Sequence, residues 1–382
     1  MYCLLSLILY AIPFSIEWSS LPSGGIIAVE CAGDVNSDGT EDVYAASNSY
    51  GIGCLDGISG DVLWWKSGIP KPYSTECFRT VGDIDLDGVA DLAVGTGVEY
   101  AIIAISGATG DILWISKQNE IPLFIQKANG PEPGDVFVLA SKVHPYDWCE
   151  FFALDGQSGY LAWSTSLIST LSFLMCVTEN DVSGNGWSEM GYVIDRSTVM
   201  NGAACVRDGH TGVNIGGAGA WFYPSMDITD TPIPCLAVSN WGNDPVMWVE
   251  DIITGITVWS SNDPSLSFQV LKFIPNITGA ATPYPEILSR QGVNIRLIRG
   301  DDGYFQDTYT FPASIKSVES YLDGSLWRAA VTTSTSLHCP LLTFESPSIE
   351  PSVQLPGSGG TDMCFLNSDL YPTPLIAISM GG

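Results

Sequence analysis

The chain has 382 residues, 46% of them hydrophobic, and its 14 basic and 42 acidic residues give a net charge of −28. This charge argues against a nucleic acid partner, since affinity for nucleic acid depends on cationic neutralisation of phosphate. With 40 Gly, 23 Pro and no long segment of helical period, the chain is predicted to be all-β, with many turns and an ample core.

The chain begins with an apolar run of fourteen residues that ends near Ser15. The run is short for a membrane span and suits the core of a signal peptide. No Lys or Arg precedes it and no clean cleavage site follows it, so a mis-set start that leads into the first strand is the alternative. We expect residues 1–15 to be a signal peptide or hydrophobic N-terminal segment, residues 16–382 to form one repeat domain, and no transmembrane segment.

An acidic turn then occurs three times in phase. The first is Asp34-Val-Asn36-Ser-Asp38-Gly-Thr40-Glu-Asp42, and it returns 49 residues later as Asp83-Ile-Asp85-Leu-Asp87-Gly-Val89-Ala-Asp91. A third version, Asp181-Val-Ser183-Gly-Asn185-Gly-Trp187-Ser-Glu189, begins 98 residues beyond that. Oxygen-bearing side chains at positions 1, 3, 5 and 9, with Gly at position 6, are typical of turns that wrap Ca²⁺. The sequence therefore predicts a repeat protein whose turns bind calcium.

These turns differ from an EF-hand loop in two ways. Position 12 carries Ala45, Val94 or Tyr192 in place of a bidentate Glu, and the residues that follow are typical of a strand. The turns should therefore join strand to strand, with backbone carbonyls at position 7 and water completing the shell and a dissociation constant of about 10⁻⁴–10⁻³ M. The alternative is an Asx-rich turn without metal. We expect two to three structural Ca²⁺ sites, with these predicted ligands: Asp34, Asn36, Asp38, Thr40, Asp42, Asp83, Asp85, Asp87, Val89, Asp91, Asp181, Ser183, Asn185, Trp187 and Glu189.

A second turn, of the form Asp-Gly-x-Ser/Thr-Gly followed by an aromatic residue, runs through the chain in the same phase. Its closing glycines are separated by 50, 49, 53, 43 and 48 residues, and four of the turns lead to Trp64, Trp114, Trp163 and Trp259. Self-similarity at this period, with four strand-like runs per unit, indicates the blades of a β-propeller. A sugar-binding platform is one interpretation of the Trp series. Packing between blades is favoured, because a ring at one place in each repeat fills the same gap.

The number of blades is less sharply defined. Repeat starts can be placed near residues 27, 77, 132, 174, 225, 271, 316 and 361. The last start supplies two strands, while Ser15–Ser20 resembles the final strand of a blade. We predict a single propeller of about eight four-stranded blades, closed by pairing of the N- and C-terminal strands, with seven blades as the alternative.

The acidic turns resemble the FG-GAP repeats of integrin-α-type propellers, and the Gly-Trp turns are similar to the repeats of quinoprotein-like propellers. This resemblance implies a non-catalytic secreted or cell-surface protein used for adhesion or scaffolding, with an unknown protein or glycan as partner. We expect it to be monomeric and extracellular, periplasmic or on the cell surface, where calcium is abundant enough to fill weak loops. The alternative is a quinoprotein-like or polysaccharide-lyase-like enzyme acting at the axial channel. The chain shows no catalytic motif, and Asp195-Arg196, Arg296 and Arg299 are more simply explained as ion pairs than as cofactor contacts.

Overall fold

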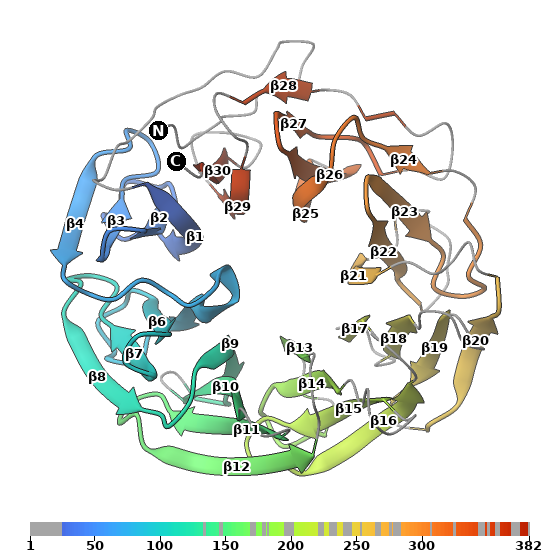
Figure 1. Ribbon diagram of the computed structural model, residues 1–382, viewed down its shortest axis with the longest axis horizontal. Helices are drawn as coiled ribbons and strands as arrows, with labels where there is room; N and C mark the ends of the chain where they lie inside the picture. Colours follow the sequence, from blue (N-terminus) through green and yellow to red (C-terminus); the bar gives the residue numbers. More distant parts are fainter. Residues whose placement is uncertain are drawn as a thin grey trace.

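The strands at the middle of the first two sheets are buried without alternation, because both of their faces are covered. All residues of β2 (Asp42–Ser47) and β6 (Asp91–Thr96) are buried, whereas β4 (Val62–Ser67), at the outer edge, is half-exposed. Continuous apolar strands of this kind need a neighbouring layer on each side. In the computed structural model the sheets satisfy this need by packing face to face in a ring, so that the chain is a single all-β propeller (Figure 1).

The structure describes residues 25–132, 135–144, 148–168, 173–177, 181, 183–194, 202–220, 225–228, 235–239, 247–252, 254–263, 269–274, 277, 284–305, 308–323, 326–342, 348–349, 352–355, 360–367 and 375–380. The predicted signal peptide, residues 1–15, lies outside them. So does Ser15–Ser20, the segment predicted to pair with the C-terminal strands.

Within these residues there are seven four-stranded sheets and one two-stranded sheet, all antiparallel. The first sheet holds β1 (Ile26–Gly33), β2, β3 (Gly51–Leu55) and β4; after the short 3-10 helix η1 (Thr75–Cys77), the second holds β5 (Phe78–Gly82), β6, β7 (Ala101–Ile105) and β8 (Ile112–Lys117). The third holds β9 (Pro122–Asn129), β10 (Val136–His144), β11 (Trp148–Asp155) and β12 (Leu161–Ile168), and the fourth β13 (Phe173–Val177), β14 (Glu189–Ile194), β15 (Gly202–Asp208) and β16 (Asn214–Ala220).

The fifth sheet holds β17 (Ser225–Ile228), β18 (Cys235–Ser239), β19 (Met247–Asp251) and β20 (Thr257–Ser261), and the sixth β21 (Gln269–Ile274), β22 (Glu286–Gln291), β23 (Asn294–Ile298) and β24 (Tyr309–Thr310). The seventh holds β25 (Ile315–Asp323), β26 (Leu326–Thr333), β27 (Ser336–His338) and β28 (Ser352–Gln354). The last, two-stranded sheet holds β29 (Gly360–Leu366) and β30 (Leu375–Met380).

The predicted repeat starts match the first strands of these sheets, with one exception. The third sheet begins at Pro122, ten residues before the predicted start near residue 132. Residues 130–132 and Asp135 instead lie between β9 and β10, where the N–H of Gly130 donates to the carbonyl of Asp135 (2.6 Å). The prediction was wrong because this turn lacks the Asp-rich pattern that marks the same place in the first two sheets.

The hydrophobic core is divided among the gaps between neighbouring sheets. One cluster joins the first two sheets through Tyr44, Phe78 and Leu92, all completely buried. On the other side of the first sheet, Val29 packs against Leu366 and other residues of β29 and β30. The N–H of Val29 also donates to Asp362 Oδ2 (3.0 Å), so the two-stranded sheet contacts β1 although 333 residues separate this pair.

Tryptophan packing between sheets is confirmed. The indole Nε1 of Trp64, Trp114, Trp163 and Trp259 donates to a glycine carbonyl of the next sheet at 2.6–2.9 Å. Each ring also lies against the closing glycine of that turn. At Gly159, whose φ is +69°, an added Cβ would lie 2.6 Å from the ring of Trp114. Ring and glycine therefore fit as a pair, and a bulkier residue would separate the blades.

Candidate metal loops

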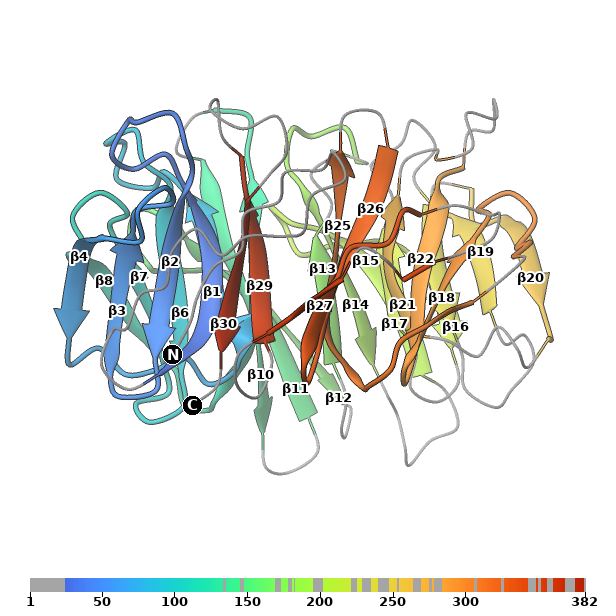
Figure 2. The ribbon, with the colours of Figure 1, turned by 90° about the horizontal axis from the view of Figure 1, so that it is seen from above.

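The three acidic turns lie at equivalent places in the fold. They connect β1 to β2, β5 to β6 and β13 to β14, and the third is described for Asp181 and residues 183–188. The expectation that each joins strand to strand is thus confirmed. Because neighbouring strands are antiparallel, these turns lie at the same end of the blades as the second class of turn, and the hairpins between second and third strands lie at the other end (Figure 2).

The backbone takes the same sharp path in all three loops. Position 6 has a φ of +90° at Gly39, +94° at Gly88 and +89° at Gly186. Position 4 is also left-handed, even where it is Ser37 (φ +61°) or Leu86 (φ +64°). Two left-handed residues within three positions turn successive N–H groups toward one side of the loop, and glycine at position 6 makes this conformation accessible.

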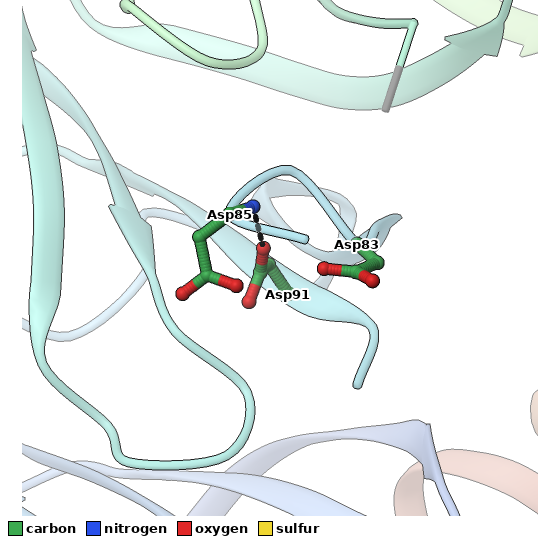
Figure 3. A group of neighbouring side chains, drawn as sticks. All are labelled: Asp83, Asp85 and Asp91. Carbon is green, nitrogen blue, oxygen red and sulfur yellow. Dashed lines mark hydrogen bonds between the residues drawn. The ribbon is translucent and has the colours of Figure 1, made fainter. Parts of the chain in front are cut away.

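In the second loop the side chains of positions 1, 3 and 9 converge. Ligand atoms of Asp83, Asp85 and Asp91 lie within 4.8 Å of one another (Figure 3). Asp83 accepts the N–H groups of Asp87 (3.0 Å) and Gly88 (2.9 Å). Burial raises the pKa of Asp85, and the nearby carboxylate of Asp87 raises it further. Three carboxylates at this spacing repel one another, and a divalent cation would relieve that repulsion.

The first and third loops repeat these hydrogen bonds. Position 1 accepts from positions 5 and 6 in both, with Asp34 bonded to Asp38 N (3.0 Å) and Gly39 N (2.9 Å). Position 5 accepts from the N–H of position 7 in all three loops, at 2.9 Å from Thr40, Val89 and Trp187. The carbonyl of position 7 was the predicted ligand group, and that role stays a prediction.

Position 9 has a structural function that the sequence analysis did not anticipate. Asp91 is completely buried and accepts the N–H groups of Ile84 (2.7 Å), Asp85 (3.2 Å) and Gly107 (2.8 Å). Burial raises its pKa to about 6 against the lowering effect of these donors. Asp42 makes the same three bonds, to Val35, Asn36 and Gly57, and Glu189 bonds to Ser183 N (2.9 Å). In the first two loops this carboxylate therefore fixes the loop to the second class of turn; the role of position 9 as a ligand stays a prediction.

That second turn brings a further oxygen to each loop, which sequence analysis also missed. Asp56 Oδ2 lies 2.6 Å from Asn36 Nδ2, Ser106 Oγ lies 3.4 Å from Asp87 Oδ2, and Asp208 Oδ2 lies 3.1 Å from Ser183 Oγ. Although burial raises the pKa of Asp56, N–H donors from Ser59 and Ile58 hold it below its ordinary value. The sequence signal for this contact is the constant phase of the two turn motifs. It places the first residue of the second class of turn beside the acidic loop.

A second group of charged residues lies on the innermost strands. Arg79, on β5, contacts Glu30 on β1 (3.5 Å) and Glu76 of η1 (2.6 Å). Burial raises the pKa of Glu30 to about 7, against the lowering effect of the Arg79 guanidinium. Burial likewise raises the pKa of Asp362, on β29, to about 6. This group joins three neighbouring sheets around the axis, and the side chains of Glu30 and Arg79 are 24% and 20% exposed.

The arginines named as alternatives lie elsewhere. Arg299 pairs with Asp302 and stacks on Tyr304, and Arg296 stacks on Phe305, both on or beside the third strand of their sheet. Asp195 and Arg196 lie outside the described residues. Within the described part of the chain no helix has the length and apolar character needed to cross a membrane.

Comparison with known proteins identifies the fold. No family model and no curated protein matches the chain. Among solved structures, BamB from Moraxella catarrhalis has a TM-score of 0.56 and 13% identity over 90% of this chain and 94% of its own. Sqt1 from Saccharomyces cerevisiae has a TM-score of 0.61 and 9% identity over 94% of this chain and 96% of its own. The rhamnogalacturonan lyase YesW has a TM-score of 0.56 and 14% identity over 93% of this chain and 72% of its own. The chain is thus similar to β-propellers of diverse kinds, and these likenesses show its fold alone.

Proposed function

We propose that the protein is a non-catalytic, calcium-stabilised propeller of the cell exterior that presents its surface to a protein or glycan partner. The observation that carries this proposal is the threefold recurrence of one loop geometry, with left-handed residues at positions 4 and 6 and a position 1 carboxylate accepting two backbone N–H groups. Such loops suit weak calcium sites, which fill only where the ion is abundant. Calcium then acts as a structural ion, and the FG-GAP-like and quinoprotein-like repeats serve as a scaffold.

The proposed ligands are the side chains of positions 1, 3 and 5, with Asp56 and Asp208 as additional oxygens in the first and third loops. Isothermal titration with Ca²⁺ and a metal count on the dialysed protein test this proposal. We expect two to three bound ions with dissociation constants of about 10⁻⁴–10⁻³ M. If no ion binds at a free calcium concentration of several millimolar, the loops are Asx-rich turns and the proposal fails.

The proposal includes a closed ring of eight blades and a monomeric state. The two-stranded sheet contacts the first sheet through Val29 and Asp362, and the N–H of Glu41 donates to the carbonyl of Asn367 (2.9 Å). A sheet of two strands leaves an edge open. We propose that the N-terminal segment around residues 15–20 covers this edge and so closes the ring.

An enzyme acting at the axial channel is a second candidate, favoured by the group of Glu30, Arg79 and Asp362 on the innermost strands. A carboxyl group with a pKa of about 7 beside a guanidinium is suited to proton transfer. Because YesW, a solved structure of similar fold, is a rhamnogalacturonan lyase, the relevant assay is incubation with pectic polysaccharides and detection of unsaturated products. Activity that is lost in Glu30→Gln would favour this second candidate over the scaffold.

A further inference from the structure

Two exposed tyrosines hold an unusual backbone conformation at the end of the blades opposite the metal loops. Tyr50, in the hairpin between β2 and β3, has a φ of +59°, and Tyr100, between β6 and β7, has a φ of +51°. Glycine or asparagine is the usual residue at such a left-handed position, because a side chain meets the following carbonyl there. Each tyrosine precedes the first residue of the next strand, so the same disfavoured choice occurs in two successive blades.

The hairpins are held in this shape by the same contact in each blade. The carbonyl of Tyr50 accepts the N–H of Gly68 (2.9 Å), and the carbonyl of Tyr100 accepts the N–H of Gln118 (2.6 Å). These are backbone contacts, which glycine would make equally well. The two residues are 46% and 43% exposed, so each side chain is accessible to a partner. Strain of this kind at an accessible residue is a reason to look for a function.

A third tyrosine connects the two hairpins. Lys71 and Tyr73 belong to the segment between the first two sheets, and Lys71 Nζ donates to Asn48 Oδ1 of the first hairpin (2.7 Å). The ring of Tyr73 lies over Gly97 of the second hairpin, where an added Cβ would be 2.8 Å from its Cδ2, and Tyr73 is 51% exposed. The segment that carries Tyr73 therefore contacts both hairpins, at the same end of the first two blades.

The charge of this surface differs from that of the opposite end. In the first two blades, residues 33–42, 55–61, 82–91 and 105–111 carry eleven acidic residues and no basic one. At the tyrosine end, residues 47–51, 67–77, 96–101 and 117–121 carry three acidic and two basic residues, a net charge of −1. A nearly neutral surface gives a strongly charged partner little electrostatic attraction. The acidic end of the blades, in contrast, would attract cationic partners and repel anionic ones.

We propose that Tyr50, Tyr73 and Tyr100 form a binding surface for a neutral oligosaccharide. Pyranose rings present an apolar C–H face that packs on an exposed aromatic ring, while their hydroxyls hydrogen-bond to polar groups beside it. Asn48 and Ser49 of the first hairpin and Lys71, two residues before Tyr73, supply such groups. A protein partner is less favoured, because the core of a protein interface is depleted of charged residues such as Lys71. This inference rests on the proposed function, of which it names the class of partner, and the residues that carry it lie away from the calcium loops.

The test is isothermal titration of the full chain, in calcium, with cellohexaose, xylohexaose, mannohexaose, maltohexaose and chitohexaose. We expect at least one to bind with a dissociation constant below about 1 mM. Tyr73→Ala and Tyr50→Gly should each weaken it by roughly tenfold. Tyr50→Gly should also keep or raise Tm, since glycine suits the left-handed position, so that lost binding cannot be ascribed to lost folding.

Two controls separate this inference from the proposed function. Tyr160→Ala removes a tyrosine that is 78% exposed at the other end of the blades, and should leave binding unchanged. Asp83→Asn should weaken calcium binding and leave oligosaccharide binding intact. The inference is overturned if none of the five sugars binds, if the Tyr50 and Tyr73 variants bind as the wild type does, or if Tyr160→Ala weakens binding equally.

Discussion

Replacing Asp83 by Asn tests whether the second loop binds calcium. The change keeps the size of the side chain and removes one of the three carboxylates whose oxygens lie within 4.8 Å. In chelator, the amide oxygen can keep one of the two N–H bonds that Asp83 accepts from Asp87 and Gly88, and losing the other costs about 1 kcal/mol. Relief of repulsion offsets this, since two charges at that separation in water repel by about 1 kcal/mol. The expected net loss in chelator is therefore about 0–1 kcal/mol.

Calcium should enlarge that loss. A site with a dissociation constant of about 10⁻⁴–10⁻³ M stabilises the folded wild type by about 1.4–2.7 kcal/mol at about 10 mM Ca²⁺. A variant that binds too weakly to fill at this concentration forgoes nearly all of that stabilisation. Denaturant unfolding of the wild type and of Asp83→Asn, in calcium and in chelator, gives the loss of free energy of unfolding in each condition. The prediction is that the loss in calcium exceeds the loss in chelator.

The control is Asp61→Asn, which removes one acidic charge from an exposed position in the turn between β3 and β4. Its effect on the free energy of unfolding should be small and the same with and without calcium. Equal losses for Asp83→Asn in both conditions would refute the metal interpretation of the loop. The same conclusion would follow if Asp61→Asn showed the same dependence on calcium, because that would be a response to net charge.

Three further changes test other parts of the argument. Trp114→Phe keeps a ring between the blades but deletes the bond to the carbonyl of Gly156 (2.6 Å), and should lower the free energy of unfolding by about 1–3 kcal/mol, measured by denaturant unfolding. Because the pKa of Glu30 is raised from about 4.5 to about 7, its contribution to stability is present below pH 4.5 and lost as pH rises through 7. The free energy of unfolding of Glu30→Gln, relative to that of the wild type, should therefore rise by about 1–3 kcal/mol between pH 5 and pH 8, and by less if the partly exposed carboxylate is screened. Denaturant unfolding across this pH range measures it, and equal pH profiles of the two proteins would contradict the prediction. A chain lacking residues 1–24 should melt at a lower temperature than one lacking residues 1–15, because only the longer deletion removes the segment proposed to cover the edge of the last sheet.

The parts of the fold that sequence predicted were those encoded within a few residues. The acidic turns and the Gly-Trp turns each carry their geometry in five to nine neighbouring residues, so their positions, and the strands that flank them, could be placed from composition and phase. The Trp packing followed from its regular place in the repeat. The third blade was misplaced because its first turn has Gly130 and Pro131 where the first, second and fourth blades have alternating oxygens.

What could not be predicted depends on pairing between segments. Asp56 reaches the first loop because β3 lies beside β2 in a fixed register, so the common phase of the two turns indicates the contact only once that pairing is known. The three N–H groups that Asp91 accepts come from two different turns, so its structural role emerges only once both turns are placed. The contact between the last sheet and the first is of the same kind, since it joins residues more than 300 positions apart.

The buried carboxylate at position 9 and the oxygen-bearing side chains at positions 1, 3 and 5 have separable roles. Glu286 opens β22, the second strand of a sheet whose preceding segment lacks the acidic pattern, and it is buried and accepts the N–H of Ile277 (2.9 Å). A buried acid at the start of the second strand therefore persists where the metal pattern has disappeared. This comparison indicates that position 9 belongs to the folding of the blade, since an unpaired backbone N–H in the turn would otherwise be costly. The oxygen-bearing side chains at positions 1, 3 and 5 have no such counterpart before β22, which is what a separate, metal-binding purpose in the first, second and fourth blades requires.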